Sequence, residues 1–138
     1  MRTAFLRRPE SFTFHFRRGL RSLRDGKMEA AVEELRQAVQ FRSDFADVHN
    51  YLGVACAEMQ DWTGAVEAFH RALEVNADYV VARLNLAFAL AEAGRDEEAL
   101  EELRLVLRQE PDNQPALARL EELQAPRRER ARAGDSRA

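Results

Sequence analysis

The sequence repeats with a period of 34 residues, and this feature restricts the possible folds more than any other. Small residues return at positions 19, 53 and 87 and at 31, 65 and 99, and large apolar residues return at 35, 69 and 103. Such a period is typical of stacked helix pairs, because one pair alone cannot bury its apolar face. We therefore expect an array that works by presenting a surface. The residues in phase are Gly19, Gly53 and Ala87; Ala31, Ala65 and Ala99; and Leu35, Phe69 and Leu103.

Each unit of the repeat is predicted to hold two helices, and the units span residues 12–45, 46–79 and 80–113. In the second helix of each unit, apolar residues recur at relative positions 0, 1, 4, 7 and 8, which places them on one helical face. No strand is expected, so the fold class is all-α. The small residues would let the two helices of a pair approach closely.

The ends of these helices are predicted from turn and cap residues. Gly26 and Gly94 stand where the first helix of a unit should end, and glycine adopts the left-handed conformation of that turn at little cost. An aspartate precedes each following helix and is expected to accept hydrogen bonds from its free backbone N–H groups. These expected caps are Asp44, Asp78 and Asp112.

The in-phase residues resemble the tetratricopeptide repeat, whose pattern includes Leu, Gly or Ala, an aromatic residue, and later Ala, Phe, Ala and Pro. The resemblance covers about residues 12–113 and is weakest in the first unit, where Arg18 and Ser22 depart from the pattern. It implies a right-handed superhelical solenoid of antiparallel helix pairs. The matching residues of the second unit are His49, Leu52, Gly53, Cys56, Ala65, Phe69, Ala72 and Ala77; those of the third are Arg83, Leu86, Ala87, Leu90, Ala99, Leu103, Val106 and Pro111.

Three further segments flank the repeats. Residues 1–11 form a basic and aromatic lead-in, which we expect to be neither a secretory signal nor a transit peptide. Residues 114–125 are predicted to form a capping helix with an inner stripe of Leu117, Leu120 and Leu123, and with Arg119 on its charged outer side. Residues 126–138 lack periodicity and are predicted to be a disordered, arginine-rich tail.

The amino-acid composition argues against several classes of protein. The net charge of -3 argues against general nucleic-acid binding, and no segment approaches the length of an apolar membrane span. A single cysteine, Cys56, excludes an intramolecular disulfide and fits a reducing compartment, so we expect a cytoplasmic protein. Lys27 is the only lysine among many arginines, which is a hint of a bacterial source.

No arrangement of residues indicates catalysis, a metal site or a cofactor. His15 and His49 occupy equivalent repeat positions, which predicts a packing role, and Cys56 lies on an apolar helix face. The adjacent glutamates, such as Glu33 and Glu34, diverge around a helix and do not converge as an acid–base pair must. We therefore expect that the protein is not an enzyme and that it needs no cofactor and no metal.

The resemblance implies that the first helix of each unit lines a concave groove in which a peptide can bind. An apolar strip should run along it, with asparagines to hold a peptide backbone and with arginines at one end and glutamates at the other. Leu20, Val54 and Phe88 are also expected to pack between helices, and Arg17, Asn50, Tyr51 and Asn85 to be exposed. The predicted groove residues are Phe16, Arg17, Leu20, Arg24, Asn50, Tyr51, Val54, Glu58, Val81, Leu84, Asn85, Phe88 and Glu92.

One branch of the family can be compared directly. Its chaperone-binding members hold a C-terminal carboxylate with lysine, arginine and asparagine side chains on the first helices. The corresponding positions here carry Phe16, Leu20, Tyr51, Val81 and Asn85, so the cationic clamp is missing. An acidic chaperone tail is not the expected ligand.

These observations favour a cytoplasmic adaptor or scaffold that binds a peptide or helix of a partner protein. The alternative is a self-association module that forms homo-oligomers through the repeat ends or through an N-terminal plug made of Phe5, Leu6, Phe12 and Phe14. A third hypothesis is contact of the arginine-rich tail with nucleic acid or lipid, although Glu129 and Asp135 make a solvated tail the better interpretation.

Overall fold

The computed structural model describes residues 11–125, and this part of the chain is built from seven helices with no strand. The lead-in residues 1–10 and the tail 126–138 lie outside the described residues. The expectation of an all-α fold is confirmed. The helices are α2 (Phe12–Arg24), α3 (Met28–Phe41), α4 (Ala46–Glu58), α5 (Trp62–Val75), α6 (Val80–Glu92), α7 (Asp96–Gln109) and α8 (Gln114–Gln124).

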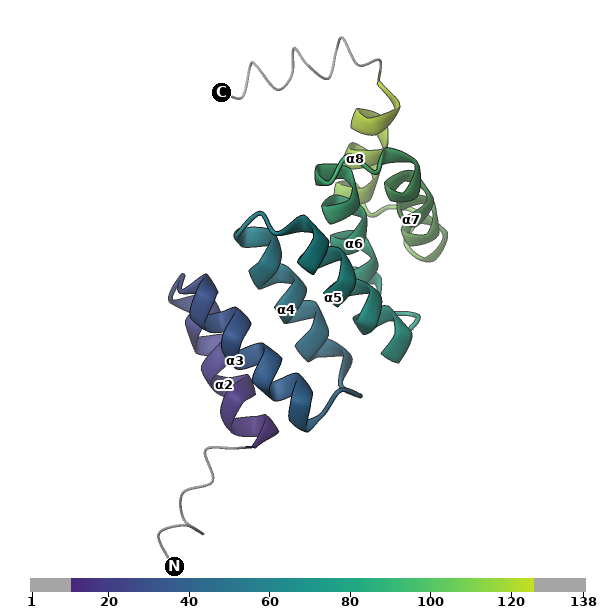
Figure 1. Cartoon of the computed structure of the whole chain (residues 1–138). Helices are drawn as coiled ribbons and strands as arrows, with labels where there is room; N and C mark the ends of the chain where they lie inside the picture. Colours follow the sequence, from purple (N-terminus) through teal and green to yellow (C-terminus); the bar gives the residue numbers. More distant parts are fainter. Residues whose placement is uncertain (1–10, 126–138) are drawn as a thin grey trace, which may run out of the picture.

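The helices form a solenoid of antiparallel pairs (Figure 1). The most extensive contacts join α2 with α3, α4 with α5, and α6 with α7, and each pair then packs on the next. Helices α2, α4, α6 and α8 also touch one another in sequence, whereas α3, α5 and α7 have no comparable contact among themselves in the described region. The first set therefore lies on the inner side of the curve. We call α2, α4, α6 and α8 the inner helices and α3, α5 and α7 the outer helices.

The small residues at the repeat positions bring the two helices of a pair together. A Cβ atom added at Gly53 would collide with the Phe69 ring, and one added at Gly19 would lie 2.7 Å from Leu35 Cγ. In the third pair, Ala87 and Leu103 are both fully buried in the same cluster. The core is thus a row of large outer-helix side chains that contact small inner-helix residues.

The turns inside the pairs share one hydrogen-bonding pattern. The backbone N–H groups of Lys27, Asp61 and Arg95 each donate to the carbonyl five residues earlier, as in a Schellman motif. Gly26 and Gly94 adopt left-handed backbone angles, with φ of 76° and 81°, as the sequence predicted. In the middle pair, Gln60 takes this conformation without being glycine, with φ of 60°.

The aspartates predicted to cap the inner helices do not do so. The N-cap residues of α4, α6 and α8 are Phe45, Tyr79 and Asn113, one residue after each aspartate. Asp44 instead accepts a hydrogen bond from Arg42 Nε at 2.8 Å. A cap must stand immediately before the first helical residue, so these carboxylates lie one position too early to reach the free N–H groups.

Asp61 is a true cap, because its carboxylate accepts a hydrogen bond from the Gly64 backbone N–H at 3.0 Å at the start of α5. We expect Asp61→Ala to lower the free energy of unfolding by about 1 kcal/mol, because this N–H group loses its acceptor. Asp44→Ala is the matched control and should leave stability nearly unchanged. Urea denaturation followed by circular dichroism measures both; equal losses would contradict this account of capping.

Helix α8 turns a different face inward than the sequence suggested. Leu117 is 38% exposed, whereas Ala116 is fully buried and packs with Leu120 and Leu123. The inner stripe is therefore Ala116, Leu120 and Leu123. The small side chain of Ala116 lets α8 approach its neighbours closely, and Leu117, one residue later, is turned by about 100° away from them.

Candidate functional site

The predicted groove residues lie on three inner helices but differ in exposure. Arg17, Arg24, Tyr51, Glu58, Val81 and Glu92 are exposed; Phe16, Leu20, Val54, Leu84, Asn85 and Phe88 are half-buried; and Asn50 is buried. Val81, at 56%, is the most exposed of the apolar members. The half-buried residues therefore both pack between helices and contribute to the surface.

A pocket of about 490 Å³ opens at the C-terminal ends of α4 and α6. It brings together five of the predicted groove residues, and residues of α5 and α8 complete its wall. The residues of the N-terminal part of the groove, such as Phe16 and Tyr51, are outside this pocket. We call it the C-terminal pocket; its lining is Val54, Ala57, Glu58, Gln60, Trp62, Phe69, Asn85, Phe88, Ala89, Glu92 and Arg119.

Asn50 is buried, although the sequence predicted it to be exposed. Its side chain is buried, with 5% of its surface exposed, and its Oδ1 accepts a hydrogen bond from Asn85 Nδ2 at 3.1 Å. Asn50 lies where α4 packs against α6, so its amide is used within the protein. Asn85 itself is half-buried and lines the C-terminal pocket.

Tyr79 belongs to the same polar network, and the sequence analysis missed it. Its phenol interacts with the Asp47 carboxylate and the Asn50 amide. Burial, and then the hydrogen bond to Asp47, raise the pKa of the Tyr79 phenol well above its usual value. The phenol is therefore neutral at physiological pH. The sequence could have indicated this role, because Tyr79 stands immediately before α6, where α4 and α6 come together.

The N-terminal part of the groove is aromatic. The Phe12 ring stacks on Phe16 at 5.2 Å between centroids and meets the Phe45 ring edge-on at 5.7 Å. Phe16 in turn lies 6.0 Å from Tyr51. Phe12 and Phe14 are thus part of α2 and not of a separate plug, which corrects that part of the self-association hypothesis. Phe5 and Leu6 lie outside the described residues.

Arg119 was expected on the outer side of α8, but it reaches back to α6. Its Nη2 lies 2.6 Å from Glu92 Oε1 and its Nη1 lies 3.2 Å from Glu122 Oε2. The guanidinium carbon stands 5.4 Å from the centre of the Phe88 ring. Arg119 therefore ties α8 to α6 and forms one edge of the C-terminal pocket. In the sequence, Arg119 follows the small residue Ala116 by three positions, and this spacing places both residues on one face of the helix.

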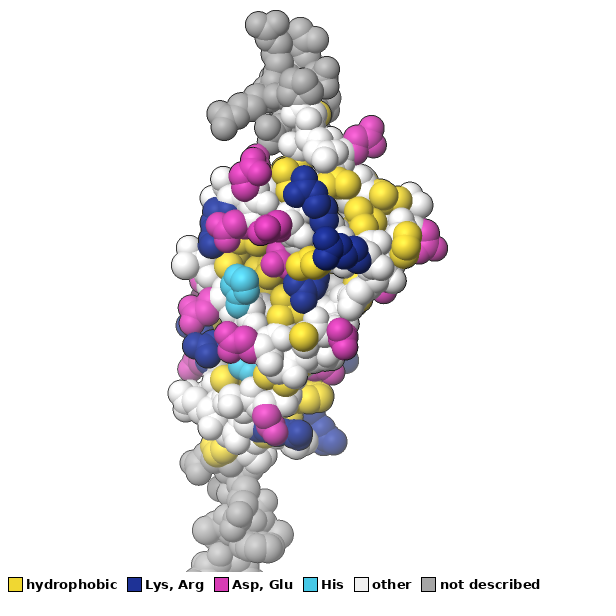
Figure 2. All heavy atoms as spheres, turned by 90° about the vertical axis from the view of Figure 1, so that its right-hand side faces the viewer, with side chains coloured by type: hydrophobic (Ala, Val, Ile, Leu, Met, Phe, Trp, Pro, Cys, Tyr) yellow, Lys and Arg dark blue, Asp and Glu magenta, His cyan; other side chains and the backbone are white. Residues whose placement is uncertain are grey.

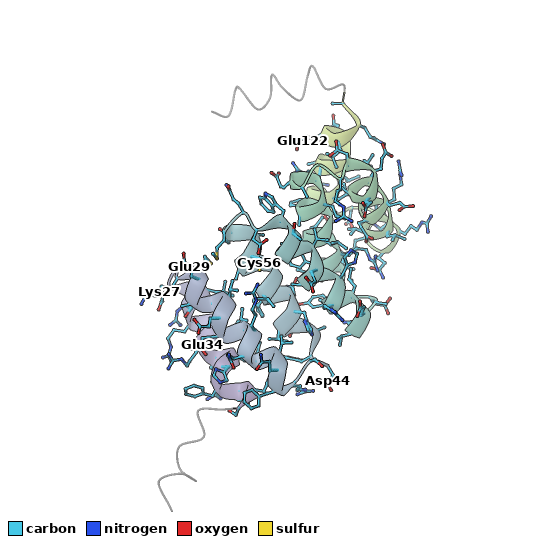
Figure 3. All side chains as sticks on the ribbon, viewed as in Figure 1. Lys27, Glu29, Glu34, Asp44, Cys56 and Glu122 are labelled. Carbon is cyan, nitrogen blue, oxygen red and sulfur yellow. The ribbon has the colours of Figure 1, made fainter. Side chains whose placement is uncertain are left out.

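The histidines and the cysteine are packed within the protein. His15 Nδ1 lies 2.7 Å from Glu34 Oε2, and His49 Nε2 lies 2.8 Å from the Ser43 carbonyl oxygen. Burial and the nearby Asp61 raise the pKa of the Cys56 thiol, so it is protonated at neutral pH. Glu34 and Cys56 extend from different helices (Figure 3). Over residues 11–125, no group of three or more His, Cys, Asp or Glu side chains is placed to hold a metal ion.

The face at the right of Figure 1 carries charges of both signs. Arginine side chains gather at the centre of this face beside hydrophobic ones, and acidic side chains are distributed around them (Figure 2). The arginines of α7 that are exposed, such as Arg104 and Arg108, are accompanied on the same helix by exposed Glu97 and Glu101. On this face, therefore, positive and negative charges are mixed.

Comparisons with known proteins agree with the helix pairs. Two family models match, one described as tetratricopeptide repeat at residues 57–123 and one as TPR repeat at residues 23–60. Similar solved structures include the Arabidopsis OM64 TPR domain (TM-score 0.78, 21% identity, 82% of this chain and 93% of that chain). The second TPR domain of human RPAP3, in complex with an HSP70 peptide, has a TM-score of 0.78 at 22% identity, over 81% of this chain and 93% of that one.

A third similar structure is YrrB, described as a TPR protein with an unusual peptide-binding site. Its TM-score is 0.74 at 21% identity, over 79% of this chain and 56% of that chain. At these levels of identity the structural likeness shows a shared fold.

Proposed function

Because this chain belongs to the tetratricopeptide repeat family, we propose that it is a non-catalytic adaptor that binds a peptide or helix of a partner protein in the groove of its inner helices. The observation that carries this proposal is the C-terminal pocket, in which Val54, Asn85 and Phe88 from two helices surround about 490 Å³ of space. A volume of this size accommodates one large side chain with its neighbouring backbone.

The structural neighbours support the same class of ligand. A human RPAP3 domain is described in complex with an HSP70 peptide, and YrrB is described by its peptide-binding site. Our chain has the same fold, and its groove combines half-buried apolar side chains with the Asn85 amide. This combination suits a ligand that inserts apolar anchors and is oriented by a few hydrogen bonds.

The ligand should differ from an acidic chaperone tail. Among the positions of the family's cationic clamp, Phe16, Leu20 and Tyr51 offer aromatic and aliphatic surface, and Asn85 is neutral. The groove therefore favours burial of apolar groups over capture of a carboxylate.

The remaining parts of the proposal concern what the protein does not require. We propose no catalytic group, no cofactor and no nucleic-acid ligand, and a cytoplasmic location that agrees with a single free, buried cysteine, Cys56. In the part of the chain that the structure describes, no helix has the length and apolar character needed to cross a membrane.

The experiment uses a phage library of random 12-residue peptides, selected on the immobilised full chain. We expect enriched peptides to bind at least tenfold more weakly to Tyr51→Ala/Phe88→Ala, because both substitutions remove aromatic surface from the groove. Far-ultraviolet circular dichroism should show unchanged helix content. The matched control is Phe41→Ala/Val75→Ala, which removes exposed apolar side chains from outer helices. Equal affinity of the groove variant and the wild type would argue against this site.

A further inference from the structure

We infer that the C-terminal pocket selects a partner peptide in which a large apolar side chain is followed by an arginine or lysine. This inference rests on the proposed function and specifies the chemistry of its ligand. The apolar side chain would occupy the pocket, and the cation would lie at its acidic rim.

The inner surface of the pocket is apolar. Val54 and Ala57 contribute from α4, and Phe88 and Ala89 from α6, while Trp62 and Phe69 close the side toward α5. Phe69 and Ala89 are almost completely buried, so they are fixed parts of the wall. An aromatic or long aliphatic side chain that enters this space loses its contact with water, which favours binding.

The rim of the pocket is acidic. Glu58 is exposed and has no hydrogen bond or ion pair with any residue of the described chain. Glu92 is paired with Arg119 but remains 48% exposed at its side chain. Arg119 also contacts Glu122, so one guanidinium is shared between two carboxylates and does not reach Glu58. The rim therefore retains net negative charge, which a ligand cation can neutralise.

The opposite end of the groove has the opposite charge. Arg17 and Arg24 are exposed on α2, which contains no acidic residue, and Arg24 Nε lies 3.6 Å from Asp25 Oδ1 just after the helix. A ligand cation is attracted to Glu58 and repelled from this end, so the charge distribution also sets the direction of the peptide.

A second depression, of about 550 Å³, lies between α3 and α5 on the outer side. Its lining mixes Arg36 and Arg71 with Glu67 and Glu74, so it gives no preference for the sign of a ligand. The acidic rim that can select a ligand by its charge is therefore found at the C-terminal pocket.

The test is the sequence content of the selected 12-residue peptides. We expect peptides enriched on the full-length wild type to share an aromatic or long aliphatic residue followed within two positions by arginine or lysine. Glu58→Arg should weaken their binding at least tenfold, and selection on this variant should lose the basic residue. Glu33→Arg is the matched control, because Glu33 is an exposed glutamate of α3 far from the pocket lining, and it should change nothing.

Each other outcome is decisive. Peptides that require Tyr51 and Phe88 but contain no basic residue would overturn this inference and leave the proposed function intact. Peptides that are indifferent to Tyr51 and Phe88 would overturn both. A tenfold gain in affinity on Phe5→Ser/Leu6→Ser in the full chain would show that the chain's own Phe-Leu-Arg-Arg segment occupies the pocket, which would overturn the assignment to a separate partner.

Discussion

Phe69→Ala should lower the free energy of unfolding by about 3–5 kcal/mol, a large part of the stability of a domain of this size. Phe69 is the largest fully buried side chain in the protein's described core, and its ring fills the space opposite Gly53. Gly53 has no side chain that could move into the space left by the ring. The change should therefore remove both the transfer free energy of the ring and the packing around it.

Urea denaturation of the wild type and the variant measures this loss. The matched control is Phe41→Ala, since Phe41 is 48% exposed and stacks on His15 at 5.7 Å. It should cost less than half as much. Losses of similar size would mean that the middle helix pair is not the centre of the core.

The second large effect is expected at Gly53 itself. A Cβ atom there would meet three atoms of the Phe69 ring at distances that real Cβ atoms do not show. Alanine normally favours a helix over glycine by about 0.8–1.0 kcal/mol, but forcing the aromatic ring away should cost about 1–3 kcal/mol. We expect Gly53→Ala to destabilise the protein by a net amount of up to about 2 kcal/mol.

Gly19→Ala is the comparison at the equivalent position. The added Cβ would lie 2.7 Å from both Cγ and Cδ2 of Leu35, which is fully buried, but a leucine can shift more easily than a rigid aromatic ring. The cost at Gly19 should therefore be smaller than the cost at Gly53. If the Phe69 ring causes the loss at Gly53, then Phe69→Leu should reduce the cost of Gly53→Ala in a double-mutant cycle. Independent, additive effects of the two substitutions would contradict the contact.

The 34-residue repeat by itself predicts most of the fold. Gly53 and Phe69 recur in phase with Gly19 and Leu35, and this recurrence predicts helix pairs with closely approaching backbones. Gly26 and Gly94 marked turns that require positive φ. These features could be read from the sequence because helix periodicity and glycine turns depend on neighbouring residues in the chain.

The groove was predictable only in part. The repeat positions gave the inner helices and therefore the list of groove candidates, but they could not give the exposure of each side chain. Asn50 is buried because α6 brings Asn85 and Tyr79 against it, and none of these contacts is local in sequence. The same limit explains the error for Arg119, whose partner Glu92 lies on a different helix.

The sequence by itself determined that the chain forms helix pairs, where the turns between them fall, and which residues recur at the pair contacts, since these follow from local periodicity. Only the tertiary structure decided which polar groups are paired inside the protein and which remain exposed. Asn50 and Arg119 are paired across helices, whereas Glu58 is left exposed at the pocket rim. The reason is physical: hydrogen bonds and ion pairs depend on distances of a few ångströms between separate helices, and packing sets those distances.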